Sequence, residues 1–394
     1  MANTLLTPTW VLRESLRILH EKLSFLGTIM LDYDDTYKVG GAKRGDTLKV
    51  RLPNQYTVSS GATMVNQDTE ESSVDLVTST QKHIATRFTS AEMTLSQEDF
   101  SKRVVAPMMS TLASNVESDA LQTMTKQVHN VVGTAGSTAD YLDFLNAAAR
   151  LDQNLAPPDD RCAQVNSLTQ VGLINELKGL FHQSTEISRQ YREGMMGRTG
   201  GLDFYKQQKI LSYAEGADVA GAVDDIGATI ASGDTTIPVD GYTAALTVGD
   251  VVTFADVFAV HPETKQVYSH LQQFVITAAT TTLLTIDPPI YSTGAKQNVD
   301  ALPADNAAVA LAGTPSASTT YQHDLVYQKE AFAFTTADLE LPQGTHFSAR
   351  DQLDGISMRI ISDYDIVNDR TPTRIDILYG FKAVRPSLAC RVIS

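Results

Sequence analysis

Residues 249–277 read GDVVTFADVFAVHPETKQVYSHLQQFVIT, two runs rich in β-branched and aromatic residues on either side of the polar stretch HPETKQ. This pattern predicts two strands joined by a turn. The signal continues on both sides, because residues 216–313 carry few charges and alternate short apolar runs such as TTIPV and TLLTI with turn sequences such as SGDT and VDGY. Short strands at such spacing are typical of a small barrel or sandwich. Since mixed sequence bounds the region on both sides, we expect an inserted β-domain.

The residues that precede this region follow a different pattern. Apolar residues at helical spacing predict an amphipathic helix over residues 9–25. The runs TLKVRL (47–52) and HIATRF (83–88) predict strands, and the mainly polar residues 53–82 separate them. An excursion of that length inside a compact domain is more often functional or extended than a simple connection.

A long helix is predicted from Ser96 to about residue 130. The stretch SQED supplies an N-terminal cap and acidic residues for the first turn. Pro107 lies inside the segment and predicts a kink or break, because proline lacks an N–H and crowds the preceding turn. The predicted apolar stripe comprises Phe100, Val104, Met108, Leu112, Val116, Leu121, Met124 and Val128.

The remaining sequence mixes helices and strands. Residues 133–215 contain helical runs such as TADYLDFLNAAARLDQN and SLTQVGLINELKGLFHQ. After the β-region the chain returns to strands, and Ile375, Ile377, Tyr379 and Phe381 alternate along the last long one. We therefore expect an α+β chain that carries one β-insertion.

Composition excludes several classes of protein. The chain has 394 residues, 42% of them hydrophobic, and no apolar run approaches the roughly 20 residues that cross a bilayer. The N-terminal residues lack the pattern of a signal peptide, so we expect a cytoplasmic protein. A net charge of −15 disfavours direct binding to nucleic acid but not its enclosure. Cys162 and Cys390 show neither disulfide nor metal-ligand spacing, and we interpret both as buried apolar residues.

No strong catalytic or cofactor motif is present, so we predict neither enzymatic activity nor a cofactor. Two other functions stay open. A cytoplasmic Cys/His hydrolase would pair Cys162 with a histidine such as His182. A surface adhesion or receptor-binding protein would use the β-domain and the RGD sequence at 44–46. His261 and His270 flank the hairpin turn at a spacing that permits a shared metal, although an exposed turn with unpaired histidines is the simpler interpretation.

The order of these elements resembles a known family. It is carried by DTLKVRLPNQY before the long excursion, STLASNVESDALQTM in the long helix, GLDFY before the insertion, VGDVVTFADVFAVHPETKQ within it and LYGFKAVRP near the end. Together they resemble the major capsid (coat) proteins of tailed bacteriophages, which have the Hong Kong ninety-seven capsid fold. The narrower resemblance is to the short-tailed Salmonella-phage branch, whose coat protein carries an inserted β-barrel.

The resemblance implies a domain for each part of the chain. The implied domains are an N-terminal arm (1–40), an extended loop with peripheral strands (41–95), a spine helix (96–132), an axial domain in two parts (133–215 and 313–372), the inserted β-barrel (216–312) and a returning peripheral strand (373–394).

The function implied is the building of an icosahedral shell. Many copies would assemble as hexons and pentons with a scaffolding protein and a portal protein into a procapsid, which expands when double-stranded DNA is packaged. Assembly would take place in the host bacterial cytoplasm, and the product would be the capsid of the virion. The DNA would be enclosed without specific binding, and no membrane is involved. Residues 52–81 contain no lysine, so we predict maturation without covalent cross-links.

Charge suggests two contact sites within this implied scheme. The first is the acidic tip of the extended loop, formed by Asp68, Glu70 and Glu71, which we expect to meet a basic surface of an adjacent subunit. The candidate basic partners are Lys102, Arg103, Arg189 and Arg192. The second is the first helix, where Glu14 and Glu21 are the positions we expect to contact the scaffolding protein, although Arg13, Arg17 and Lys22 lie alongside.

Overall fold

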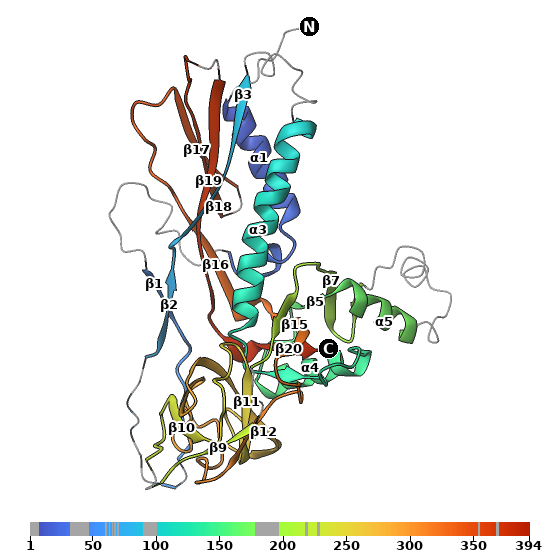
Figure 1. Cartoon of the computed structure of the whole chain (residues 1–394). Helices are drawn as coiled ribbons and strands as arrows, with labels where there is room; N and C mark the ends of the chain where they lie inside the picture. Colours follow the sequence, from blue (N-terminus) through green and yellow to red (C-terminus); the bar gives the residue numbers. More distant parts are fainter. Residues whose placement is uncertain are drawn as a thin grey trace. The chain divides into compact units, whose positions relative to one another are not determined.

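The computed structural model describes residues 8–31, 47–59, 61–62, 64, 66, 68, 71–89, 101–177, 197–216, 220–226, 229–353, 355–367 and 370–394. The chain forms two compact units (Figure 1). Unit 1 comprises Met1–Val50, Val74–Ala120 and Phe332–Lys382, and unit 2 comprises Arg51–Ser73, Leu121–Ala331 and Ala383–Ser394.

Unit 1 is built around a five-stranded sheet with the order β16-β19-β18-β17, in which β3 pairs with β19. Its strands are β3 (Thr80–Thr89), β16 (Phe332–Ala337), β17 (Phe347–Leu353), β18 (Ile356–Ser362) and β19 (Arg370–Ala383). Helix α1 (Pro8–Lys22) packs against β17 and β18. Of the four residues predicted to alternate along β19, Ile375, Ile377 and Tyr379 are buried, whereas Phe381 is half-buried.

The long helix is shorter than predicted. A π-helical turn, Ser101–Val105, leads into α3 (Ala106–Thr125), and residues 90–100 lie outside the described part of the chain. Pro107 is the second residue of α3, directly after the π-helical turn. The buried stripe contains Val105 and Met109 in place of the predicted Val104 and Met108. After Thr125 the N–H groups of residues 127 and 128 bond to carbonyls three residues back, which ends the helix.

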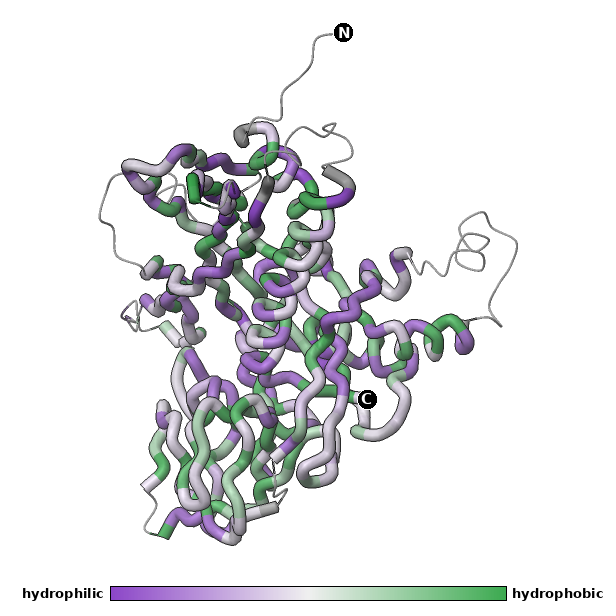
Figure 2. The backbone as a smooth tube through the Cα atoms, turned by 45° about the horizontal axis from the view of Figure 1, so that its top comes forward, coloured by the Kyte–Doolittle hydropathy of each residue, from purple (hydrophilic) through white to green (hydrophobic). Residues whose placement is uncertain are grey.

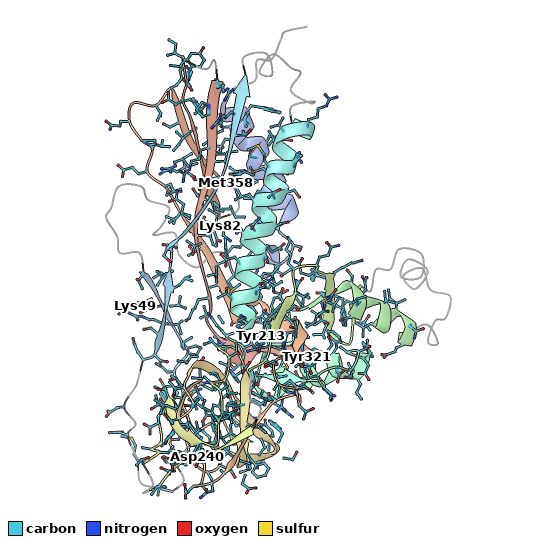
Figure 3. The ribbon with its side chains drawn as sticks, viewed as in Figure 1. Lys49, Lys82, Tyr213, Asp240, Tyr321 and Met358 are labelled. Atoms are coloured by element: carbon cyan, nitrogen blue, oxygen red, sulfur yellow. The ribbon has the colours of Figure 1, made fainter. Side chains whose placement is uncertain are left out.

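Polar contacts join α3 to the sheet inside unit 1. Asp119 accepts a hydrogen bond from the Tyr379 hydroxyl (2.6 Å) and forms an ion pair with Lys82 of β3 (3.1 Å; Figure 3). Two residues before Asp119 on α3, the side chain of Glu117 is fully buried and its carboxylate accepts a hydrogen bond from the backbone N–H of Phe25 (2.5 Å). The helix is therefore fixed both to the sheet and to the segment that follows α1.

The polar excursion is a loop closed at its base by a two-stranded ribbon. β1 (Thr47–Arg51) pairs with β2 (Ser73–Val77), which the sequence analysis did not predict. The pairing continues one step further, because the N–H of Leu52 donates to the carbonyl of Ser72 (2.9 Å).

Unit 2 contains a seven-stranded sheet with the order β4-β20-β15-β5-β7-β6, in which β8 pairs with β15. Its strands are β4 (Val131–Val132), β5 (Arg161–Val165), β6 (Arg198–Thr199), β7 (Leu202–Lys206), β8 (Leu211–Ala214), β15 (Thr320–Gln328) and β20 (Ala389–Ile393). Helices α4 (Tyr141–Gln153) and α5 (Ser167–Leu177) belong to the same unit. Cys162 and Cys390 are free and buried in β5 and β20, which confirms the interpretation of both as core residues.

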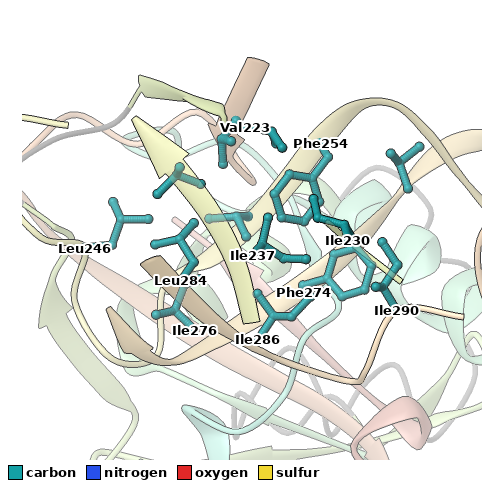
Figure 4. Packing of buried hydrophobic residues seen from close by; sticks show 14 of the residues in the cluster. Val223, Ile230, Ile237, Leu246, Phe254, Phe274, Ile276, Leu284, Ile286 and Ile290 are labelled. Carbon is teal, nitrogen blue, oxygen red and sulfur yellow. The ribbon is translucent and has the colours of Figure 1, made fainter. Parts of the chain in front are cut away.

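The predicted β-insertion is a closed six-stranded barrel with the order β10-β13-β12-β11-β14-β9. Its strands are β9 (Ala220–Val223), β10 (Thr236–Asp240), β11 (Val251–Val260), β12 (Val267–Ala279), β13 (Leu283–Asp287) and β14 (Ala308–Leu311). Hydrophobic and hydrophilic residues are interleaved along these strands (Figure 2). The inward residues form one core, which includes Ile237, Phe254, Phe274, Ile276, Leu284 and Ile286 (Figure 4). The predicted α+β chain with a barrel inserted in it is confirmed.

The C-terminal region contributes strands to both units. Residues 332–382 belong to unit 1, whereas 313–331 and 383–394 belong to unit 2. The reason is strand pairing: β19 pairs with β3 and β18, while β20 pairs with β15 and with β4.

Candidate functional site: the anchorage of the barrel

The barrel is inserted between two strands that lie side by side. β8 leads into it and β15 follows it, and these two strands pair antiparallel from Ala214↔Thr320 to Leu211↔His323. Both connections of the barrel therefore start at this pair of adjacent strands in the sheet of unit 2. Two adjacent connections alone would leave a hinge, so further contacts must fix the barrel in place.

One such contact is made by the Asp250 carboxyl group at the start of β11. Its Oδ2 accepts hydrogen bonds from the N–H of Thr247 (2.7 Å) and from the N–H of Gly216 (3.2 Å). Gly216 permits this approach because it has no side chain: a Cβ there would lie 2.9 Å from the Asp250 carboxylate and 3.1 Å from the Leu246 Cα. The segment that enters the barrel is thereby tied to the turn before β11.

Arg391 of β20 is the centre of a second contact. Its side chain is fully buried, and it donates to the carbonyls of Gly249 (2.8 Å), Lys126 (3.0 Å) and Val128. The carbonyl of Gly249 also accepts from the Tyr213 hydroxyl (2.9 Å; Figure 3). One guanidinium thus joins the barrel turn, the segment after α3 and the last strand. Charge-assisted bonds of this kind are about twice as strong as neutral ones.

Two ionisable groups at this junction, His323 and Asp250, have strongly shifted pKa values. Burial, with Arg391 as the next cause, lowers the pKa of His323 to about 3. Burial and the neighbouring Glu215 raise the pKa of Asp250 to about 8. His323 Nε2 lies 3.5 Å from Glu215 Oε1, and the His323 ring stacks on Tyr213 with centroids 4.9 Å apart. The junction therefore contains an uncharged imidazole and a carboxyl group that keeps its proton at neutral pH.

Backbone and apolar contacts complete the anchorage. The side-chain amide of Gln273 in β12 pairs with both backbone groups of Val131: it accepts from the N–H (2.8 Å) and donates to the carbonyl (2.9 Å). Beside it, Val131, Val251, Val275 and Ile393 form a small apolar cluster. The barrel and the sheet thus share a boundary of hydrogen bonds and apolar contacts.

This junction predicts a specific dependence of stability on pH. The folded protein keeps a proton on Asp250 that the unfolded chain releases above about pH 4, so this group destabilises the fold as pH rises from about 4 to about 8, by up to about 1.4 kcal/mol per pH unit. His323 acts in the opposite direction, because its lowered pKa reduces stability as pH falls below 6.5 towards about 3. Asp250→Asn keeps an acceptor for both N–H groups and removes the titration.

We expect the stability of Asp250→Asn relative to the original protein to increase steadily between pH 5 and pH 8. The urea midpoint, followed by circular dichroism at several pH values, measures this difference. Glu263→Gln, in the exposed turn of the β11–β12 hairpin, is the control and should show no such trend. A constant difference across the range would contradict a proton held by Asp250.

The predicted contact of the loop tip with an adjacent subunit stays a prediction, and the structure describes only some of its residues. Asp68 is exposed, and Glu71 lies 3.7 Å from Arg51 of the same loop base, with both side chains largely in solvent. Arg103 is exposed. Glu70, Arg189 and Arg192, as well as the side chain of Lys102, lie outside the described part of the chain.

The predicted scaffold-contact residues on α1 differ in their surroundings. Glu14 accepts hydrogen bonds from Arg17 Nε (3.0 Å) and Nη2 (2.7 Å), and its side chain is 19% exposed. The Glu14 carboxylate therefore already has a partner one turn along its own helix. The side chain of Glu21 lies outside the described residues.

The chemistry of Cys162 does not support the hydrolase. Burial, followed by the charges of Asp203 and Asp160, raises the pKa of its thiol to about 12, whereas a nucleophilic cysteine requires a lowered pKa. His182 and the RGD sequence lie outside the described residues.

The simpler interpretation assumed unpaired histidines in the hairpin turn, but both His261 and His270 have partners. His261 Nδ1 accepts from the backbone N–H groups of Glu263 and Thr264 (3.1 Å each), and His270 stacks on Tyr268. Among the described residues, no cluster of histidine, cysteine and acidic side chains is arranged to hold a metal ion.

Sequence reasoning missed the residues that anchor the barrel. Arg391 stands in ACRVI, a strand in which every residue is buried, and a single arginine in such a run is a signal for an internal charge contact. Glu215 and Asp250 gave no comparable signal, because each stands in an ordinary turn sequence. No helix among the described residues is long and apolar enough to span a membrane.

Comparison with known proteins adds a decisive observation. The sequence model described as "P22 coat protein - gene protein 5" matches residues 43–391, nearly the whole chain. The chain belongs to the P22 coat protein family. It is therefore a capsid protein with the α+β capsid fold, and the resemblance to the short-tailed Salmonella-phage branch is confirmed.

Solved structures similar to this chain include three whose descriptions name a phage, a phage capsid or a coat-protein domain. The protein of Mycobacterium phage Che8 is 11% identical, with 89% of this chain and 85% of that chain covered and a TM-score of 0.44. The capsid of Ralstonia phage GP4 is 7% identical, with coverage of 89% and 84% and a TM-score of 0.44. The CUS-3 coat protein I-domain is 28% identical over 24% of this chain and 96% of that chain, with a TM-score of 0.20. No curated protein matches the chain.

Proposed function

We propose that this capsid protein is the major shell protein of a double-stranded DNA phage. It assembles with copies of itself, a scaffolding protein and a portal protein into a procapsid in the host cytoplasm, and the procapsid expands on DNA packaging to give the capsid of the virion. The match of the coat-protein family to residues 43–391 is the observation that carries this proposal.

The loop between β1 and β2 supports a role in contacts between copies. It exposes large apolar side chains that a monomeric protein has no reason to present: Val58 is 96% exposed, Met64 81% and Tyr56 57%. A loop of this kind contributes little to its own core and gains apolar burial only on a neighbour. A shell also benefits from individually weak contacts, of about 4 to 8 kcal/mol each, because errors can then dissociate.

Two further features support the proposed assembly route. Residues 52–81 contain no lysine, so the loop offers no amine for a covalent link, and mature particles should run as monomers on denaturing gels. A cross-linked ladder would refute this. The net charge of −15 suits a container whose DNA is enclosed without being bound.

Co-expression with the scaffolding protein of the same phage tests the function. We expect closed shells by negative-stain electron microscopy and a sedimenting peak that contains both proteins. A compact monomer at high concentration in the presence of the scaffolding protein would refute the proposal. In the same assay, Glu14→Lys tests the proposed contact on α1: unchanged incorporation of scaffolding protein would show that Glu14 takes no part.

The loop tip gives a prediction of its own. We propose that Asp68, Glu70 and Glu71 approach a basic surface of an adjacent subunit. Because Glu71 lies near Arg51 of the same chain, its reversal would also create a repulsion within the loop. Among the described residues Asp68 forms no ion pair, so Asp68→Lys is the cleaner variant.

We expect Asp68→Lys to slow assembly several-fold at low salt and to have little effect at high salt, since exposed ion pairs contribute about 0 to 1 kcal/mol and are screened. Light scattering during assembly at two ionic strengths measures this, with Asp68→Asn as the intermediate control. Equal rates for Asp68→Lys and the original protein at low salt would exclude the contact.

A further inference from the structure

A groove in unit 2 lies next to the barrel anchorage and shares Val131 and Gln273 with it. It has a volume of about 440 Å³ and lies between α4, the segment after α3 and strand β12. Its polar lining side chains are Asn146, Arg150, Gln153, His270 and Gln273, and none of the lining residues is acidic. A water molecule occupies about 30 Å³ of liquid, so the groove has room for a hydrated ion or a side chain from another molecule.

Arg150 is the unusual member of this lining. Its guanidinium is partly buried, and within the described part of the chain it has no ion pair and no side-chain hydrogen bond. Arg161, nearby in sequence, shows the usual arrangement, with an ion pair to Asp152 (2.7 Å) and a bond to the carbonyl of Pro157 (2.8 Å). Burial lowers the pKa of Arg150, yet a guanidinium stays charged in proteins. A desolvated positive charge therefore faces the groove without a counter-charge.

The charge of Arg150 helps to lower the pKa of two imidazoles, His270 and His129. Burial is the main cause that lowers the pKa of His270 to about 4, and the charge of Arg150 is the second. His129, next to the groove wall, has its pKa lowered to about 4 by burial and then by Arg391 and Arg150. Neither imidazole is charged at neutral pH. Both can therefore donate or accept one hydrogen bond without adding to the repulsion.

We propose that this groove is an oxyanion site, in which the Arg150 guanidinium receives a phosphate or carboxylate group and the side-chain amides of Asn146 and Gln153 add donors. A planar guanidinium matches the two oxygens of such a group. The oxyanion can come from free phosphate or from an acidic side chain of a second copy, and these sources share the same chemistry. Arg150 also lies in the last turn of α4, where a helix favours positive charge, but that effect alone predicts no response to anions.

A substitution on α4 can place a carboxylate of the chain itself next to Arg150, where the oxyanion would bind. Asn146 is exposed and stands four residues before Arg150 on α4. Asn146→Glu places a carboxylate at the position that favours an ion pair with an arginine at i+4. Asn146→Gln has the same size without the charge and is the matched control.

A phosphate titration followed by NMR tests the proposal. The sample is the assembly-competent protein with isotope-labelled histidine rings. Chloride is replaced by phosphate so that the ionic strength stays constant. We expect the His270 and His129 signals to shift and to saturate with a dissociation constant on the order of 1 mM. Asn146→Glu should bind phosphate about fivefold more weakly or worse, since two like charges 4 Å apart in water repel by about 1 kcal/mol. Asn146→Gln should behave like the original protein, and acetate should compete with phosphate.

Either of two results would overturn the oxyanion site: no saturable shift in the original protein, or equal phosphate affinity in the original protein and Asn146→Glu. Arg150→Gln is the second variant and should abolish the shift. The same titration on sedimented shells separates the sources. A response retained in shells indicates free phosphate, and a response lost there but present in the monomer indicates an acidic side chain of a neighbouring copy.

Discussion

Arg391→Met is expected to destabilise unit 2 by about 3 to 5 kcal/mol, the largest effect of any single substitution at the barrel anchorage. Methionine retains much of the side-chain volume but donates no hydrogen bond. The carbonyls of Lys126 and Val128 lose the donor they share, and the carbonyl of Gly249 keeps only the Tyr213 hydroxyl. Buried carbonyl groups that lose their partners cost free energy comparable to the lost bonds.

The readout must report on unit 2 in particular. Amide hydrogen exchange supplies it, and the largest loss of protection should appear at Gly249 and at strand β20, which Arg391 joins. The barrel core should remain protected, because its own cluster is untouched. Arg198→Met, at an exposed arginine of the same unit, should leave exchange unchanged. Protection equal to that of the original protein in Arg391→Met would show that the guanidinium is not an anchor.

Gly380→Ala is expected to destabilise unit 1 by about 3 kcal/mol or more, because strand β19 passes very close to the end of β2 at this position. A Cβ on Gly380 would lie 2.1 Å from the carbonyl oxygen of Val77 and 2.9 Å from the Cα of Thr78. Both obstacles are backbone atoms, so no rotamer change relieves the clash. One of the two strands has to move.

The single tryptophan, Trp10, lies in α1 of unit 1 and reports on this unit by fluorescence. Urea unfolding followed at Trp10 should show a clearly lower midpoint for Gly380→Ala. Gly27→Ala is the matched control, since a Cβ there meets nothing within 4 Å and the position belongs to the same unit. If both variants unfold at the midpoint of the original protein, the close approach of β2 and β19 does not exist in solution.

The sequence predicted the barrel because its long strands carry a strong local signal. The runs around Phe254 and Phe274 alternate inward apolar residues with polar ones, and polar turns separate them. Strands β9 and β14 were not predicted, since AGAV and AVAL have small side chains that fit a helix, a strand or a loop equally well. Only the closure of the barrel makes them strands, and closure depends on pairing between residues far apart in the chain.

The pairing partners of the C-terminal strands are hard to predict from sequence for the same reason. Whether β20 joins one sheet or another depends on its partners β15 and β4, which its own sequence does not contain. Likewise, the shift of the buried stripe of α3 from Met108 to Met109 follows a π-helical turn that no residue pattern announced.

The candidate sites show the limits of reasoning from charge along the chain. Charged residues attract attention where they cluster, as at Glu70 and Glu71, but the anchorage uses isolated groups on β8, β11 and β20 that meet only in the folded unit. Arg150 is a similar case. Its sequence context is an ordinary amphipathic helix, and only the lack of a partner in the described structure distinguishes it.

The pairing of β8 with β15 has a consequence for how this protein arose and how it can be engineered. Because Ala214 and Thr320 face each other across one ladder, a tight turn between them would close a plain hairpin and remove everything in between. The barrel is thus an insertion whose two ends meet at one position in the sheet. A single genetic event could therefore add, remove or exchange it in evolution. Foreign domains with neighbouring termini should fold when inserted between Ala214 and Thr320. They need to supply a hydrogen-bond acceptor for Arg391 in place of the Gly249 carbonyl.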